Sequence, residues 1–205
     1  MKIVKPKIKY TEEKTISKCL EENSFDNVLI NKNDDNICIN NISIDSAIFD
    51  NIIFQEMYNV SLIDVIFNNC DLSNVNFDDE FLTRVVFNNC KLSGASFINS
   101  NLEDIEFNNC ILKYMNVNST KIERVKWDDC DLSETIIDNC KVKDLLLNKN
   151  KLFKTEIRNT LLNKTDFTTC DTYGVIFDMK SVKGIVVNSL QCRDLALMLD
   201  IRIKD

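Results

Sequence analysis

The sequence predicts an all-β protein folded as a quadrilateral β-helix, followed by a short C-terminal helix and a terminal strand. An apolar residue recurs at every fifth position in all but one of 26 consecutive five-residue units, residues 60–189, without an insertion or deletion. A period of five fits neither an α-helix nor a flat strand. The 205 residues include only 3 glycines and 1 proline. The chain must therefore turn by a device other than ordinary loop residues.

A chain that buries one side chain in every five must turn after each unit, and four such units close a square coil. Stacked coils place residues that are four units apart on top of one another. The sequence shows this match as a phenylalanine-rich and a leucine-rich column: Phe67, Phe87, Phe107, Trp127, Leu147, Phe167 and Val187; Leu72, Leu92, Leu112, Leu132 and Leu152. Four further units span Ile37–Glu56, and we expect Met57–Asn59 to break the phase, with room for a bulge there. At ~4.8 Å per coil, about 7.5 coils give a rod about 36 Å long.

The two ends depart from the period. Residues 1–36 are predicted to form an N-terminal cap and an irregular first coil, with a short helix inside Thr11–Leu20 capped by Thr11. Residues 37–188 form the predicted solenoid. Residues 189–205 are predicted to form a helix over Ser189–Leu199, with Asn188 or Ser189 as N-cap, and a strand-like tail over Ile201–Ile203.

The five-residue units resemble the pentapeptide repeat family, whose pattern is A(D/N)Lxx with Leu or Phe at the centre. The resemblance implies a right-handed quadrilateral β-helix. The segment from Gly184 to Ile203 is similar to the C-terminal module of the loop-free Qnr-type and MfpA-type subgroup. That similarity implies binding to DNA gyrase and topoisomerase IV, protection from quinolones, and a homodimer formed through this module, here by Leu190, Leu195, Met198, Leu199, Ile201 and Ile203.

The charge is uneven along the chain. The net charge is −7, which disfavours direct nucleic-acid binding, and residues 60–140 alone carry 14 acids and 6 bases, net −8. This section spans about 19 Å of coil, over which duplex DNA carries about 11 charges. A DNA-like surface is therefore predicted on the following residues: Asp64, Asp71, Asp78, Asp79, Glu103, Asp104, Asp128, Asp129 and Asp131.

An alternative stays open, because these acids encircle the rod instead of forming one stripe. Ordinary solvation of polar faces explains such a distribution equally well. The repeat itself supports a general protein-interaction scaffold with an unrelated partner to the same degree, because the fold does not determine function.

We expect no enzyme, no cofactor and no metal site. The chain has no histidine, which removes Ser-His-Asp and Cys-His catalysis, and the adjacent pair Asp128 and Asp129 is more simply a solvated corner than a glycan-cleaving pair. No apolar run is long enough to span a membrane. Nine cysteines without a signal peptide favour reduced thiols in a cytoplasm.

Five of the cysteines share one inward-facing column, with Asn150 interrupting it: Cys70, Cys90, Cys110, Cys130 and Cys170. A linear column suits neither tetrahedral zinc nor disulfide geometry, so they are interpreted as small packing residues. Glu80 and Lys180 interrupt another inward column. Glu80 is a candidate for a bulge or local opening, although single breaks of this kind are more often tolerated at a coil corner.

Overall fold

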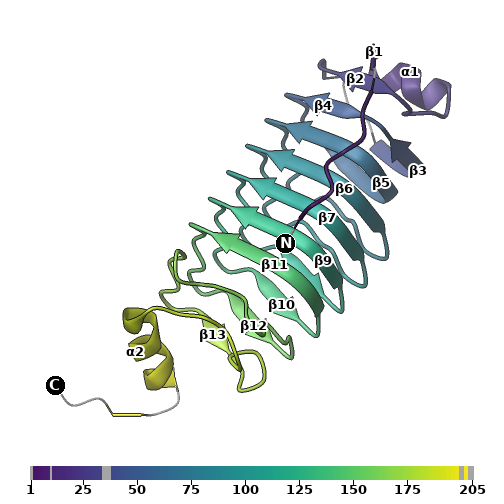
Figure 1. Cartoon of the computed structure of the whole chain (residues 1–205). Helices are drawn as coiled ribbons and strands as arrows, with labels where there is room; N and C mark the ends of the chain where they lie inside the picture. Colours follow the sequence, from purple (N-terminus) through teal and green to yellow (C-terminus); the bar gives the residue numbers. More distant parts are fainter. Residues whose placement is uncertain (1, 10, 34–37, 199–200, 203–205) are drawn as a thin grey trace.

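The structure, a computed structural model, describes residues 2–9, 11–33, 38–198 and 201–202. The coil is a stack of parallel strands (Figure 1). One sheet contains β1 (Glu12–Glu13), β2 (Val28–Ile30), β3 (Cys38–Asp45), β4 (Ile48–Asp50), β5 (Glu56–Asn68), β6 (Phe81–Asn88), β7 (Asn101–Asn108), β9 (Lys121–Asp128) and β11 (Lys141–Asn148). The second contains β8 (Asn116–Asn118), β10 (Ile136–Asp138), β12 (Glu156–Arg158) and β13 (Ile176–Phe177).

The register of the strands confirms the predicted fold class. From Leu62 onward, each strand residue pairs with the residue four units later: Phe67 pairs with Phe87, Phe87 with Phe107, and Phe107 with Trp127. Isolated bridges continue the same register on the other faces, as between Lys91 and Ile111. Each coil therefore hydrogen-bonds to the next one in the way that parallel strands do.

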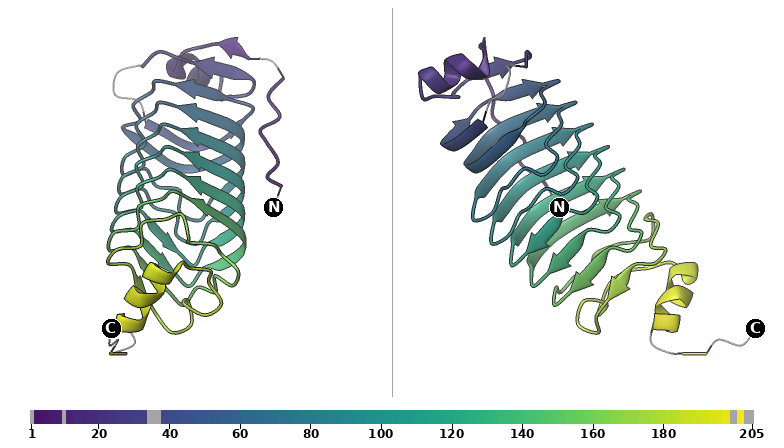
Figure 2. Two further views of the ribbon diagram at one scale, coloured as in Figure 1. Left: turned by 60° about the vertical axis from the view of Figure 1, so that its left-hand side comes forward. Right: turned by 180° about the vertical axis from the view of Figure 1, so that it is seen from behind.

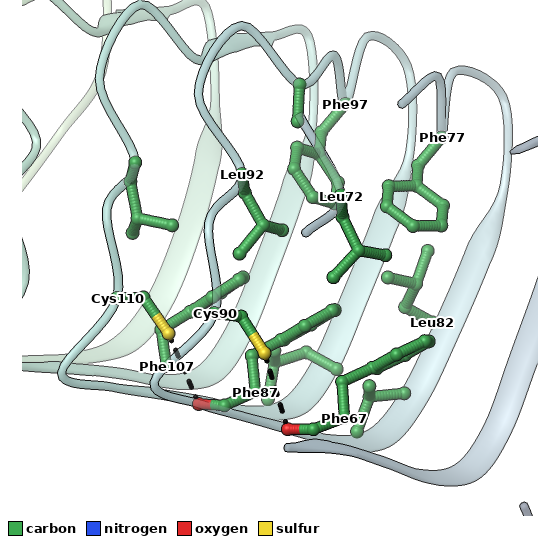
Figure 3. Close-up of a cluster of buried hydrophobic side chains, with 14 of the residues drawn as sticks. Phe67, Leu72, Phe77, Leu82, Phe87, Cys90, Leu92, Phe97, Phe107 and Cys110 are labelled. Carbon is green, nitrogen blue, oxygen red and sulfur yellow. Dashed lines mark hydrogen bonds between the residues drawn. The ribbon is translucent and has the colours of Figure 1, made fainter. Parts of the chain in front are cut away.

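The core is a column of rings inside this coil (Figure 3). The rings of Phe49, Phe67, Phe87 and Phe107 are nearly parallel, with centroids 5.1, 5.0 and 4.8 Å apart. All four side chains are at most 1% exposed. These four coils thus contribute one ring each to a continuous stack, and stability comes from contact between neighbouring coils.

The chain turns at the fifth position of the unit, where the backbone adopts positive φ. Twenty-six non-glycine residues of the described chain have positive φ, including Asp64 (φ 55°), Arg84 (φ 54°) and Lys149 (φ 52°). Asparagine and aspartate tolerate this left-handed conformation best, yet arginine, lysine, tyrosine and glutamate also occupy it. Because the register of the whole stack imposes the turn, few glycines are needed.

The predicted phase break at Met57–Asn59 is present, and the coil does not use the room for a bulge there. Before the break Ile53 pairs with Asp71, and after it Leu62 pairs with Leu82. The sequence separation between paired residues of neighbouring coils is therefore two residues larger after the break than before it. Met57 is 1% exposed and pairs with Ile39 inside β5, which runs on without interruption to Asn68. The coil therefore absorbs its short unit within a continuous strand.

Two other irregular positions resolve differently. Glu80 keeps the backbone register, since its carbonyl accepts from the Asn101 N–H at 2.8 Å, and its carboxylate accepts from the Ser61 hydroxyl at 2.6 Å. No bulge forms there. At Lys180 the chain slips by one residue: Lys180 is exposed and Ser181 takes the buried place, accepting from the Thr160 N–H.

The predicted C-terminal helix is confirmed, whereas other parts of the two ends differ from their predicted form. Helix α1 covers Ile16–Glu21 with Thr15, not Thr11, as N-cap. Helix α2 covers Ser189–Met198, and Asn188 caps it through a reciprocal pair of hydrogen bonds with Gln191. Ile201 and Arg202, the described part of the predicted terminal strand, are not in a strand.

Residues 2–9 were expected to belong to the cap, but they form an extended segment, here called the N-terminal arm, that runs back along the outside of the coils (Figure 2). None of the helices in the described ranges is long and apolar enough to cross a membrane.

Candidate functional site

The outer surface of coil section 60–140 is the candidate interaction site, and the arm covers part of it. The backbone N–H of Val4 donates to Asp104 Oδ1 at 3.0 Å, and that of Lys7 donates to Asp64 Oδ1 at 2.8 Å. Lys5 Nζ lies 2.5 Å from Glu106 Oε1. The arm is therefore bound through carboxylates of strands β5 and β7.

Asp64 and Asp104 were predicted to face a partner, and the structure places them instead beneath the arm. They are 6% and 4% exposed. Arg84 binds both oxygens of Asp64 at 2.6 and 2.7 Å, and Arg124 binds both oxygens of Asp104 at 2.8 and 2.9 Å. As placed, neither carboxylate belongs to an open acidic surface.

The pKa of each carboxyl reflects two opposing causes. Burial acts to raise the pKa of Asp64, but hydrogen bonds from Arg84 and from the Lys7 N–H outweigh it and hold that pKa below its usual range. The pKa of Asp104 is lowered in the same way by Arg124 and the Val4 N–H, against burial. Both groups are therefore charged acceptors at neutral pH.

Other predicted acids are held by neighbouring side chains. Asp71 accepts from Ser73, and Asp131 accepts from Ser133; Lys91 and Lys113 lie 3.6 and 3.3 Å from them. The remaining contacts are those of Asp128 with Lys126 at 2.5 Å, Glu103 with Arg124, and Asp78 with the Ser96 hydroxyl at 2.5 Å.

Two predicted site residues, Asp79 and Asp129, lie at corners with positive φ, 62° and 55°. Unlike Asp64 and Asp128, they form no ion pair in the described part of the chain. The column one position before Asp129 forms a ladder of side-chain amides, a feature absent from the sequence predictions. There the side-chain amides of Asn88 and Asn108 donate to the preceding coil, to Asn68 and Asn88, at 2.9 and 3.0 Å. The signal for this ladder was the asparagine that recurs at every fourth unit.

The column of cysteines is internal. These thiols are free and buried, and those of Cys70, Cys90, Cys110 and Cys130 each donate to a carbonyl of the preceding coil, as from Cys90 to Phe67 O and from Cys110 to Phe87 O, both at 3.4 Å (Figure 3). The buried hydroxyls of Ser100, Thr135 and Thr155 at the same position do likewise, as from Thr155 to Leu132 O at 2.7 Å. Residues at the first position of the unit therefore hydrogen-bond to the preceding coil and also fill space in the core. Burial raises the pKa of the Cys140 thiol to about 11.

The C-terminal helix closes the last coil. Gln191 is 7% exposed, and its Nε2 donates to the carbonyls of Phe167 and Cys170, both at 2.8 Å. The sequence pattern carries no signal for this role, because glutamine is not part of the five-residue repeat. Of the residues predicted for a dimer interface, Leu190, Met198 and Ile201 are exposed and Leu195 is partly buried, while Leu199 and Ile203 lie outside the described residues.

Comparison with known proteins gives the family. The model of the pentapeptide repeat region matches residues 60–135 and 81–157. No curated protein matches the chain. Among solved structures, full-length QnrB1, a plasmid-mediated fluoroquinolone resistance protein, is similar with TM-score 0.45 and 16% identity over 86% of this chain and 89% of that one. The pentapeptide repeat protein Rfr23 from the cyanobacterium Cyanothece 51142 is similar with TM-score 0.39 and 19% identity, over 60% of this chain and 90% of that one. With the four-unit register that its strands keep from Leu62 to Asn148 and the match of the family model, this chain belongs to the pentapeptide repeat family.

Proposed function

We propose that this protein is a DNA-mimicking rod that binds DNA gyrase or topoisomerase IV and protects the enzyme from quinolones. The observation that carries the proposal is the net charge of −8 on section 60–140, a stack of coils whose register continues without a loop. The negative charge per length of this section is comparable to that of duplex DNA, which carries one charge per ~1.7 Å. The role is non-catalytic, since binding alone competes with DNA for a basic surface.

Dimerisation through the C-terminal helix is the second part of the proposal. Leu190 is 74% exposed, and Leu197, Met198 and Ile201 are also exposed. Beside them is a mainly apolar cavity of about 300 Å³ between α2 and the last coil, lined by Phe177, Asp178, Met179, Val182, Leu195 and Met198. A second copy would cover these residues and double the length of the rod. Sedimentation of the wild type as a dimer and of Leu190→Glu as a monomer would support this contact.

A gyrase supercoiling assay with ciprofloxacin, into which the protein is titrated, tests the proposal. We expect restored supercoiling with the wild type and a loss of rescue with Asp79→Lys/Asp129→Lys. Asp144→Lys is the matched control: it is exposed, has the same φ of 62° as Asp79, and lies outside section 60–140. Lysine already occupies this corner position at Lys149 and Lys154, so the variants are expected to fold.

A general interaction scaffold with an unrelated partner is the second candidate. The observation that favours it is local neutralisation: six of the nine predicted acids form ion pairs within the rod, namely Asp64, Asp71, Glu103, Asp104, Asp128 and Asp131. If the folded protein neither rescues nor inhibits gyrase or topoisomerase IV, the scaffold is favoured and the acidic section reverts to ordinary solvation.

A further inference from the structure

The corner at the fifth position between β5 and β9 carries alternating charges. Asp64, Arg84, Asp104 and Arg124 follow one another at intervals of four units, all at positive φ between 54° and 57°. Each arginine holds the aspartate of the preceding coil through two hydrogen bonds. The carboxylates are thereby fixed in position before anything binds to them.

We propose that this corner column is a binding track for an extended basic peptide, and that the N-terminal arm is its resident ligand. The proposal does not depend on the identity of a topoisomerase partner. Its primary evidence is that a peptide is already seated there, with contacts that join residues 100 and 57 positions apart in sequence.

The spacing of the track matches that of an extended chain. The two carboxylates that accept arm N–H groups, Asp64 and Asp104, are two coils apart, or ~9.6 Å at ~4.8 Å per coil. The two donors, Lys7 and Val4, are three residues apart, or ~10 Å at ~3.3 Å per residue. The spacing of these two N–H donors therefore matches the spacing of the two acceptor coils. Asp144, exposed at the same corner two coils beyond Asp104, continues the series.

Side chains add a preference for a basic segment. The arm carries Lys2, Lys5, Lys7 and Lys9, and Lys5 reaches the buried carboxylate of Glu106 on β7. Its apolar residues Ile3, Pro6 and Ile8 are partly buried. Between the two acceptor coils lies Val86, which is only 8% exposed although it occupies an outward-facing second position. The track thus binds backbone N–H groups through carboxylates and selects lysines by charge.

Occupancy of the track also changes the surface. The four arm lysines are added to a section of net charge −8 and halve that value. A basic segment of a partner must displace the arm, so the arm acts as an intramolecular competitor.

Proline substitution tests the proposal in the full-length chain, because proline has no N–H. Val4→Pro/Lys7→Pro removes both donors from an extended segment that already contains Pro6. The variant Lys9→Pro is the matched control for Lys7→Pro: it loses one lysine and gains one proline, but its N–H is not one of the two arm donors to the track. The probe is a labelled peptide of residues 2–9, KIVKPKIK, followed by fluorescence anisotropy.

We expect the peptide to bind Val4→Pro/Lys7→Pro at least about tenfold more tightly than it binds the wild type or Lys9→Pro, in which the arm competes. Adding Asp64→Ala/Asp104→Ala should remove that binding, and a peptide with proline at the positions of Val4 and Lys7 should not bind. Equal binding to all variants would overturn the proposal, because attraction between charges alone would then explain it.

A measurement on the unmodified chain guards against a variant that does not fold. Hydrogen exchange of the Val4 and Lys7 amides should be at least about tenfold slower than that of the Lys9 amide. Equal exchange rates at these positions would refute the docking of the arm, whatever the variants show.

Discussion

The backbone N–H of Val4 donates a 3.0 Å hydrogen bond to Asp104, a residue 100 positions further along the chain. Together with the bond from Lys7 to Asp64, this contact ties the start of the chain to the middle of the rod. Two acids that a linear view of the charge assigns to an external partner are therefore bound by the protein itself. The open acids of the section are instead corner residues such as Asp79 and Asp129.

Acid should release the arm. In the folded chain the pKa values of Asp64 and Asp104 lie below the usual 3.8. Their contribution to binding of the arm is therefore complete above pH 3.8, and it is lost as the pH falls through the lowered pKa values. In an NMR titration, the amide shifts of Val4 and Lys7 should stay constant from pH 7 to about 5 and move only below about pH 4. A midpoint above 3.8 would contradict the assigned hydrogen bonds.

The ring stack should dominate stability. Phe87 is fully buried between Phe67 and Phe107, so Phe87→Ala is expected to lower the free energy of unfolding by about 3–5 kcal/mol. Phe81→Ala is the control: Phe81 begins the same strand, is 60% exposed, and should change stability by less than about 0.5 kcal/mol. Urea denaturation measures both, and equal effects would show that the stack is not the main source of stability.

Gln191 should hold the C-terminal helix on the last coil. Gln191→Ala leaves the carbonyls of Phe167 and Cys170 without their donor and is expected to cost about 1–3 kcal/mol. Hydrogen exchange of residues 165–187 should accelerate. Asp194→Ala, an exposed change in the same helix, should leave exchange unaltered; if it accelerates exchange equally, the cap depends on the helix as a whole.

The reactivity of the thiols should report whether the coils remain closed in the folded protein. Cys192 is exposed and Cys38 is partly buried, whereas the other seven cysteines are buried. Burial also raises the pKa of Cys140 to about 11 and that of Cys170 above its usual value, so less of the reactive thiolate forms. A thiol reagent at pH 8 should modify Cys192 first, Cys38 more slowly and the others only after unfolding. Cys192→Ser should abolish the fast phase; its persistence would mean that a coil opens locally.

The periodic part of the fold was predictable because its energetics repeat. A coil buries Phe87 on Phe67 and Leu92 on Leu72 by the same local geometry, so a match between residues four units apart reports spatial contact directly. The irregular parts were predictable only in outline. The pattern located the short unit at Met57–Asn59, but whether the backbone bulges there depends on its pairing with Ile39 in the neighbouring strand, which keeps β5 continuous.

The sequence by itself determined the all-β coil, its register from Val60 onward, its helical C-terminal cap and the charge of its middle section. Only the tertiary structure decided which acids remain open. Whether Asp104 is a surface charge depends on an arm residue 100 positions earlier and on Arg124 one coil later. The contact with the arm has no sequence period, because it arises where the folded coil brings distant groups within hydrogen-bonding distance.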